Sequence, residues 1–254
     1  MEQKLRYQNF KIGNTPAMLS GELSDNLYLF LHGQGGNKEE SEAFAKIVCP
    51  MGWQVLSIDL PGHGKRTDKD KFVPWVVVSE LRQVMDYVRP KYKNIALRAN
   101  SIGAWFGMLA FSNESLAQAL FVSPIVDMEK LIQNMMQWAG VTKEQLQKDK
   151  VISTDFGQAL SWEYLTWVQK YPITNWATST KILYAGQDNL TDRNVIKDFI
   201  SRFGGELFVM ENGEHWFHTP EQLAIQENWT RDSLSRQEYD MRESHNGTGD
   251  IRMF

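Results

Sequence analysis

Short apolar runs alternate with amphipathic segments along most of the chain. Six continuous apolar runs end at or beside Gly, Pro or Asp, which is typical of buried strands. They are NLYLFLHG (26–33), WQVLSID (53–59), NIALRA (94–99), AQALFVSP (117–124), KILYAGQD (181–188) and ELFVMENG (206–213). Helix-forming segments lie between several of them, at 38–52, 74–92, 101–112 and 192–204. The order of elements therefore predicts alternating strands and helices.

This alternation favours an α/β fold. Continuous apolar strands indicate a mostly parallel sheet that is covered on both faces, and the crossover rule makes a doubly wound sheet the default. Residues 5–23 lack this pattern, and we expect them to form one or two antiparallel edge strands. We expect one domain over residues 1–230 and a polar C-terminal tail over 231–254, either mobile or docked as an appendage.

One internal segment interrupts the alternation. Residues 127–176 contain helix-like stretches and no predicted strand, so we expect a small helical cap inserted between two strands of the sheet. The segment is rich in Trp and Met, and these side chains have two possible roles: to line an apolar pocket, or to hold the cap against the body. They are Met135, Met136, Trp138, Trp162, Trp167 and Trp176.

Composition narrows the class of protein. The 254 residues carry a net charge of −4, so the basic excess that nucleic-acid binding requires is missing. The chain starts with a polar stretch without the apolar core of a signal peptide, and no apolar run reaches the ~18 residues of a spanning helix. The single cysteine, Cys49, cannot form an intrachain disulfide. We therefore expect a cytoplasmic protein that binds neither nucleic acid nor a membrane.

Ser101 is the first candidate for chemistry. It follows a predicted strand and opens a predicted helix, where small neighbours such as Gly103 allow the two backbones to approach closely. A nucleophilic serine in such a turn is usually flanked by Gly on both sides, and here Ala99 replaces the first Gly. The amide of Ile102 would point toward the same space from the helix N-terminus. The alternative is that Ser101 is only a helix N-cap.

A serine nucleophile needs a base and a group that orients the base. His215 follows the last predicted strand, and we prefer it to His218, which lies three residues further on. Asp188 ends the preceding strand, and we prefer it to Asp192, which lies inside the next helix. The order Ser101, Asp188, His215 is the chain order of nucleophile, acid and base in one large fold family.

Five short motifs in that order make the sequence resemble the α/β-hydrolase fold superfamily of serine hydrolases and esterases, over about residues 20–230. The motifs are LHGQGG (31–36), DLPGHG (59–64), ANSIG (99–103), AGQD (185–188) and GEH (213–215). The resemblance implies that the backbone amides of Gln34 and Ile102 form an oxyanion hole. It also implies that His32 and His63 hold loops together rather than react.

These observations predict a serine hydrolase that cleaves a carboxylic ester or a related acyl compound, with a small-molecule and preferably apolar acyl substrate. No cofactor and no metal are expected, because neither HExxH nor GxGxxG occurs. Other reactions of the same fold remain open, namely a thioesterase, a C–C hydrolase or a lyase-like enzyme. A non-catalytic hydrolase-like binding protein is the alternative from another class.

Overall fold

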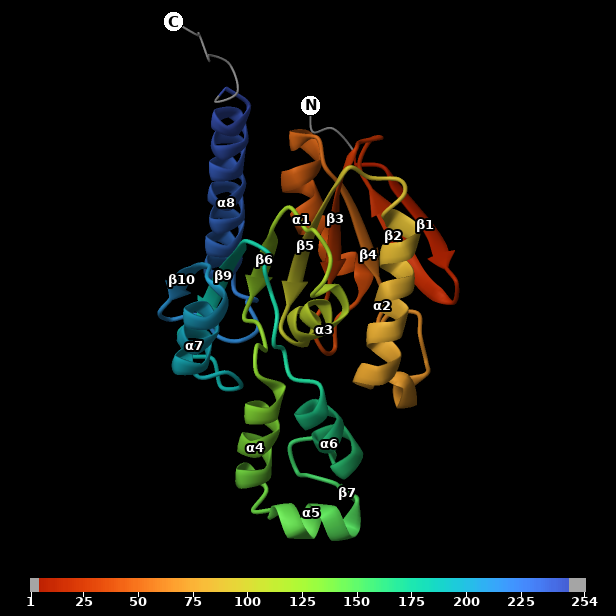
Figure 1. The fold of residues 1–254 in the computed structure, drawn as a ribbon, viewed down its shortest axis with the longest axis vertical. Coiled ribbons are helices and arrows are strands. Elements are labelled where there is room, and N and C mark those ends of the chain that lie inside the picture. The colour runs from red at the N-terminus through yellow and green to blue at the C-terminus, as the bar shows by residue number, and fades with distance from the viewer. Residues whose placement is uncertain (1–4, 247–254) are drawn as a thin grey trace, which may run out of the picture.

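Eight strands form one central sheet in the computed structural model, which describes residues 5–246 (Figure 1). The strand order is β1-β2-β4-β3-β5-β6-β9-β10, in which β2 is antiparallel to both β1 and β4 and all other pairs are parallel. The parallel core and the antiparallel edge were both predicted. The strands are β1 (Tyr7–Ile12), β2 (Thr15–Ser20), β3 (Asn26–Leu31), β4 (Gln54–Ile58), β5 (Asn94–Asn100), β6 (Ala119–Val122), β9 (Thr180–Ala185) and β10 (Glu206–Met210).

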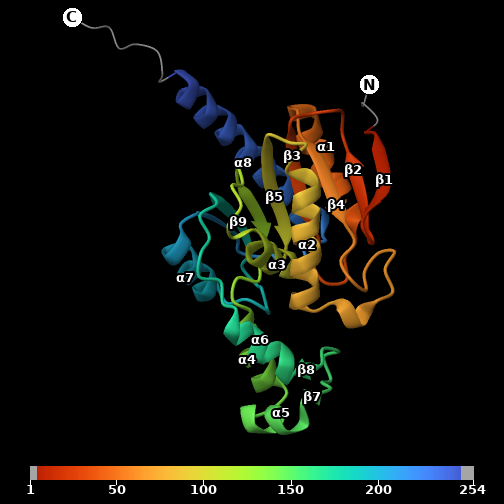
Figure 2. The same cartoon turned by 45° about the vertical axis from the view of Figure 1, so that its right-hand side comes forward.

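Helices cover both faces of this sheet, as predicted for a doubly wound fold (Figures 1 and 2). Side chains alternate along the strands, so Leu29 and Leu31 belong to one buried cluster while Tyr28 and Phe30 belong to the other. Helices α2, α3 and α7 pack on the first face, and α1 and α8 pack on the second. These helices are α1 (Ser41–Val48), α2 (Pro74–Val88), α3 (Ile102–Phe111), α7 (Arg193–Phe203) and α8 (Pro220–Asn246).

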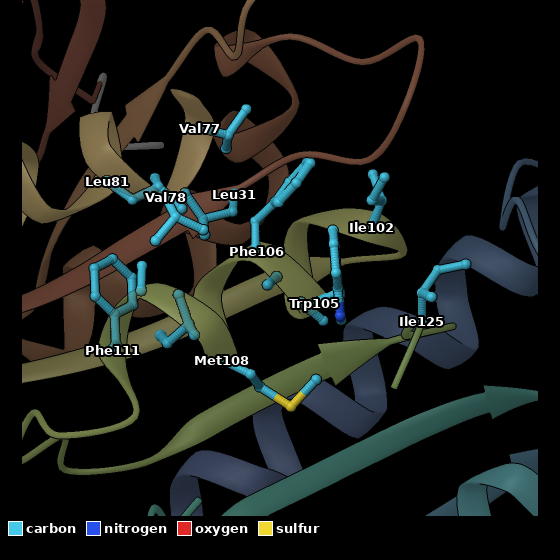
Figure 3. Close-up of a cluster of buried hydrophobic side chains, with 14 of the residues drawn as sticks. Leu31, Val77, Val78, Leu81, Ile102, Trp105, Phe106, Met108, Phe111 and Ile125 are labelled. Carbon is cyan, nitrogen blue, oxygen red and sulfur yellow. The ribbon is translucent and has the colours of Figure 1, made fainter. Parts of the chain in front are cut away.

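Helix α3 is buried along almost its whole length. Its sequence, IGAWFGMLAF, is apolar on every side, which is the pattern of a helix that is enclosed by the protein. In Figure 3, Trp105, Phe106 and Met108 point in different directions from this helix into the core. Burial fixes the helix, and it therefore also fixes the N-terminal turn that follows β5.

The cap lies beyond the carboxyl ends of the parallel strands, at the lower end of the molecule in Figure 1. It is inserted between β6 and β9, as predicted, but it is not purely helical. Two short antiparallel strands pair within it, so the expectation of a cap without strands was wrong. Its elements are α4 (Met128–Trp138), α5 (Lys143–Asp149), β7 (Val151–Ile152), β8 (Leu160–Ser161) and α6 (Trp162–Lys170).

The aromatic residues of the cap segment divide between the two proposed roles. Trp167 meets Trp105 of α3 edge to face at 6.2 Å, and Tyr164 stacks on Trp105 at 6.1 Å, so these rings join the cap to the body. Trp138 lines a cavity instead. Trp176 lies in the body, where its ring packs near Phe121.

Helix α8 continues past the predicted domain boundary at residue 230. Leu234 is buried against the sheet, and Lys181 of β9 donates a hydrogen bond to the carbonyl of Ser233 at 3.0 Å. The predicted tail therefore begins within a docked helix, and its residues 247–254 lie outside the described residues. Of the helices in the described range, none is both long and apolar enough to cross a membrane.

Candidate active site

Ser101 occupies a strained turn between β5 and α3. Its backbone has φ 49° and ψ −123°, a region that residues other than glycine rarely adopt. The turn is held by the Ser101 amide, which donates to the carbonyl of Val122 at 3.0 Å, and by the Ser101 carbonyl, which accepts from Ile125 at 3.1 Å. Ser101 stands at the N-cap position of α3, but its side chain makes no capping bond. Its hydroxyl is therefore free for another partner.

Close backbone approach explains the small residues around this turn. A Cβ atom on Gly103 would lie 2.6 Å from the carbonyl oxygen of His32 and 2.8 Å from that of Leu31, so only glycine fits there. Ala99 is fully buried in β5, between Leu31 of β3 and Phe121 of β6. A methyl group is thus accommodated on the strand side of the turn but not on the helix side.

Three predicted residues meet at the carboxyl edge of the sheet. Ser101 Oγ lies 2.8 Å from His215 Nε2, and His215 Nδ1 lies 2.7 Å from Asp188 Oδ2. The Asp188 side chain is fully buried, whereas that of His215 remains 17% exposed. Because a carboxylate accepts at Nδ1, that nitrogen carries the proton and Nε2 is free to accept one from the serine.

The carboxylate of Asp188 is fixed by its own loop. Its Oδ1 accepts hydrogen bonds from the amides of Leu190 at 2.8 Å and Thr191 at 3.0 Å, which leaves Oδ2 for the histidine. The loops that carry Asp188 and His215 are also tied together, since the amide of Gln187 donates to the carbonyl of Gly213 at 2.9 Å. This hydrogen bond fixes the position of the Asp188 loop relative to the His215 loop.

The two rejected candidates make other bonds. Asp192 caps helix α7, where its carboxylate accepts from the amide of Asn194 at 2.7 Å. His218 Nδ1 lies 2.7 Å from the carbonyl of Trp216, and the two rings stack. The structure thus brings Asp188 and His215 to Ser101, and gives Asp192 and His218 different roles.

The predicted oxyanion donors border the same cavity as Ser101. Ile102 is the first residue of α3, and Gln34 lies in the loop after β3. Within the part of the chain that the structure describes, neither amide donates to a backbone carbonyl. Neither amide is therefore used to hold the backbone of the two turns.

His32 holds the start of this loop and is neutral. Its ring lies between the carbonyl of Gly33, 2.7 Å from Nδ1, and the amide of Leu60, which donates to Nε2 at 3.1 Å. Burial lowers the pKa of His32 to about 4. His63 packs beside it, with ring centroids 5.2 Å apart. Both histidines lie where loops meet, as expected for structural residues.

A buried ion pair that the sequence did not reveal fixes the other end of the loop. The Lys38 ammonium lies 3.0 Å from Asp59 Oδ2, and both side chains are almost fully buried. Asp59 also accepts from the amides of Lys38 at 2.9 Å and Lys65 at 3.1 Å. Burial acts to raise the pKa of Asp59, but these hydrogen bonds and the Lys38 charge outweigh it and hold that pKa below its usual value.

A cavity of about 1960 Å³ opens around Ser101, and we divide it into two lobes according to the elements that supply its lining residues. The first, the cap lobe, lies between the body and the cap and is mostly apolar. It is lined by Met128, Leu131, Ile132, Met135, Trp138 and Tyr164. The second, the α1–α8 lobe, lies on the other face of the sheet. It is lined by Glu40, Ala43, Arg98, Asn100, Ala224 and Thr230. Nothing in the sequence pattern indicates this second lobe.

The described residues contain no cluster of three or more His, Cys, Asp or Glu side chains that could hold a metal ion. The polar groups around Ser101 are instead a hydroxyl, an imidazole, a carboxylate and backbone amides. Such a set can deprotonate a hydroxyl and stabilise a negative oxygen near it.

Comparison with known proteins identifies the architecture. No family model and no curated protein sequence matches this chain. Solved structures do match. Est1E from Butyrivibrio proteoclasticus with bound ferulic acid superposes with a TM-score of 0.72 at 16% identity, over 91% of this chain and 99% of that one. Mouse alpha/beta hydrolase domain-containing protein 10 gives 0.73 at 10% identity over 92% and 99%, and the thioesterase domain from the curacin biosynthetic pathway gives 0.56 at 13% over 90% and 99%. As the motifs predicted, this chain has the α/β-hydrolase fold.

Proposed function

We propose that this protein is a serine hydrolase that cleaves a carboxylic ester or a related acyl compound through an acyl-enzyme. The observation that carries the proposal is the 2.8 Å contact between Ser101 Oγ and His215 Nε2, at a turn whose strain holds the hydroxyl out of the helix. A serine that served only as a helix cap would bond to the helix amides instead.

In the first half of the reaction, His215 Nε2 takes the proton of Ser101 as Oγ attacks the carbonyl carbon. The carbonyl oxygen becomes negative and receives hydrogen bonds from the amides of Gln34 and Ile102. Asp188 keeps the Nδ1 proton in place and stabilises the imidazolium. His215 then gives its proton to the departing alcohol oxygen, and the acyl group stays on Oγ.

In the second half, a water molecule attacks the acyl carbon, and His215 takes one of its protons. The same two amides stabilise the second negative oxygen. His215 returns the proton to Oγ as the carbon–oxygen bond to Ser101 breaks, which releases a carboxylic acid and restores the enzyme. In another enzyme, the loss of one oxyanion donor costs about 3 kcal/mol.

The cap lobe supports a small-molecule substrate with an apolar or aromatic part. It adjoins Ser101 and is lined largely by Met, Leu, Ile and aromatic side chains. The matching Est1E structure holds ferulic acid, an aromatic carboxylic acid, which is consistent with this choice. A thioester is the second candidate, because the curacin thioesterase domain shares the fold and a thioester carbonyl fits the same attack.

Hydrolysis of 4-nitrophenyl butyrate and of butyryl-thiocholine by the wild type and by Ser101→Ala tests the proposal. We expect the wild type to hydrolyse the oxygen ester and the variant to lose at least about 1000-fold in kcat. Folding of the variant is checked by circular dichroism. Equal rates in the two proteins would refute Ser101 as the nucleophile, and a preference for the sulfur ester would favour the thioesterase.

A further inference from the structure

A buried arginine lies in the wall of the active-site cavity, and the proposed reaction does not use it. Arg98 stands on β5, three residues before Ser101, and only 1% of it is exposed. It borders the α1–α8 lobe, on the face of the sheet opposite to Leu97 and Ala99. A charged residue inside an apolar strand is costly to bury unless it has partners.

One nitrogen of the guanidinium group, Nη1, makes hydrogen bonds within the protein. It donates to Asn100 Oδ1 at 2.7 Å and to the carbonyl of Ala99 at 3.2 Å. Among the residues that the structure describes, Nε and Nη2 have no hydrogen-bond partner, and Nε is enclosed. Nη2 is therefore the donor that remains for a ligand, and it can bind a carboxylate through a charge-assisted hydrogen bond.

The surroundings of Arg98 are aromatic rather than anionic. The rings of Phe30, Phe44 and Trp229 lie 5.8–6.0 Å from its Cζ. These rings stabilise a cation, but they cannot accept the hydrogen bonds of Nη2. In the described range, no carboxylate lies within 4 Å of Arg98. Burial lowers the pKa of Arg98 to about 9, so the group remains a cation at neutral pH.

Glu40 is the carboxylate of the protein itself that could pair with Arg98 in place of a ligand. It lines the same lobe, and its charge acts on Arg98 although the two side chains form no ion pair. Burial raises the pKa of Glu40, and the Arg98 charge opposes that rise. The carboxylate of Glu40 lies against Gly36 instead, since a Cβ on Gly36 would be 2.5 Å from Glu40 Oε1.

We propose that the α1–α8 lobe is a carboxylate subsite, in which Nη2 of Arg98, the unpaired guanidinium nitrogen that is not enclosed, binds a carboxylate group carried by the substrate. This inference rests on the proposed function, because it assigns the lobe to one end of an ester that Ser101 opens. The substrate class is then an ester with a free carboxylate at the end of a short methylene chain. Three residues of extended strand span about 10 Å, which is an upper bound for the Cα distance from Arg98 to Ser101 because the chain turns at Ser101. The guanidinium leans toward Asn100, so a short chain spans the gap.

The alternative is that Arg98 only supports the turn by holding Asn100 and the Ala99 carbonyl. That role uses Nη1 alone and leaves Nη2 without a function. It predicts that loss of Arg98 lowers activity toward all esters equally. The carboxylate subsite predicts a selective loss instead.

Two matched substrate pairs separate these cases. 4-Nitrophenyl hexanoate and mono-4-nitrophenyl adipate differ only in a terminal methyl or carboxylate on the acyl side. Hexyl acetate and 6-acetoxyhexanoate differ in the same way on the alcohol side. The readout is the ratio of kcat/KM for the charged and the neutral ester, which a general loss of folded enzyme does not change.

We expect the wild type to favour the charged ester in one pair, and Arg98→Met to lower that ratio by roughly 10- to 100-fold, as for hydrogen bonds between charged groups. Glu40→Gln should raise the ratio. Arg82→Met, at an exposed arginine of α2 outside the cavity, is the matched control and should leave it unchanged. A ratio in Arg98→Met within twofold of the wild type in both pairs would overturn the proposal.

A second measurement covers the case in which Arg98→Met does not fold. Ala224 lies exposed on α8 and lines the lobe, so Ala224→Phe narrows the lobe without touching the core. It should lower the same ratio. Adipate should also raise the Tm of Ser101→Ala, and not that of Ser101→Ala with Ala224→Phe. Absence of this Tm shift in Ser101→Ala would refute the subsite even if ester hydrolysis is confirmed, whereas the shift without any hydrolysis would refute only the proposed reaction.

Discussion

Asp188→Asn changes one atom and tests the proton arrangement of the site. In the wild type, Oδ1 accepts from the amides of Leu190 and Thr191, and Oδ2 faces Nδ1 of His215. An asparagine that keeps its oxygen on the two amides must present its NH₂ group to Nδ1. The imidazole can then accept at Nδ1 only if its proton moves to Nε2, and Nε2 can no longer take the proton of Ser101.

The expected loss follows from this tautomer change. The opposite flip of the asparagine would place NH₂ against two amide donors, and it would cost two hydrogen bonds of a buried group. The same substitution in a serine protease triad lowers kcat by about 10⁴. This factor corresponds to about 5.4 kcal/mol of activation free energy. The fold should be retained, because the side chain keeps its shape.

The assay is the kcat for 4-nitrophenyl butyrate hydrolysis, with Asp192→Asn as the matched control. Asp192 caps α7 and makes no bond to His215, so its variant should stay within about threefold of the wild type in kcat. Its stability should change little, because Asn is about as good an N-cap as Asp. A loss of less than 10-fold in Asp188→Asn would refute the tautomer argument. A loss of activity in Asp192→Asn instead would show that the orienting acid is wrong.

Variants at three further positions test the supports of the site. Ala99→Val adds two methyl groups to a fully buried position, so it should cost about 1–3 kcal/mol of stability and lower kcat/KM. Ala99→Gly should keep the wild-type kcat/KM. A wild-type kcat/KM in the valine variant would show that the position is not tightly packed. Lys38→Met leaves Asp59 without its buried partner and should lower the unfolding free energy in urea by about 3 kcal/mol; a change below 1 kcal/mol would contradict this role. The pKa of His32 is about 4 in the fold, below its ordinary 6.5, so its contribution to stability is present above pH 6.5 and is lost as the pH falls toward 4. The stability advantage of the wild type over His32→Gln should therefore shrink by about 2 kcal/mol between pH 7 and 4.5, and a constant difference would refute the neutral buried histidine.

The fold could be predicted from the sequence because its parallel strands are buried on both faces. Runs such as residues 27–31 and 182–185 are continuously apolar, and the pattern is strong enough to place each of them. The hairpin of β7 and β8 escaped notice because each strand has only two residues, too few for an alternation to appear. The polar composition of α8 likewise hid its continuation past residue 230.

The grouping of the candidate site residues could be predicted from the sequence because each of them directly follows a strand. Ser101, Asp188 and His215 each follow a strand, and parallel strands bring their carboxyl ends together. Arg98 was not predicted as a site residue, because its environment depends on Trp229, which lies far away in the sequence. The ion pair of Lys38 could not be predicted for the same reason, since only the folded loops bring it to its carboxylate partner.

Labelling with a fluorophosphonate probe tests the central claim most directly, because the reagent forms a covalent bond only with an activated serine in a formed site. Intact mass and peptide mapping would be compared for the wild type, Ser101→Ala and Ser123→Ala. Ser123 is a matched control, since it is a buried serine with positive φ after the next strand. We expect one adduct, on Ser101, that persists in Ser123→Ala and disappears in Ser101→Ala. An unlabelled folded wild type, or an adduct on another residue, would contradict it.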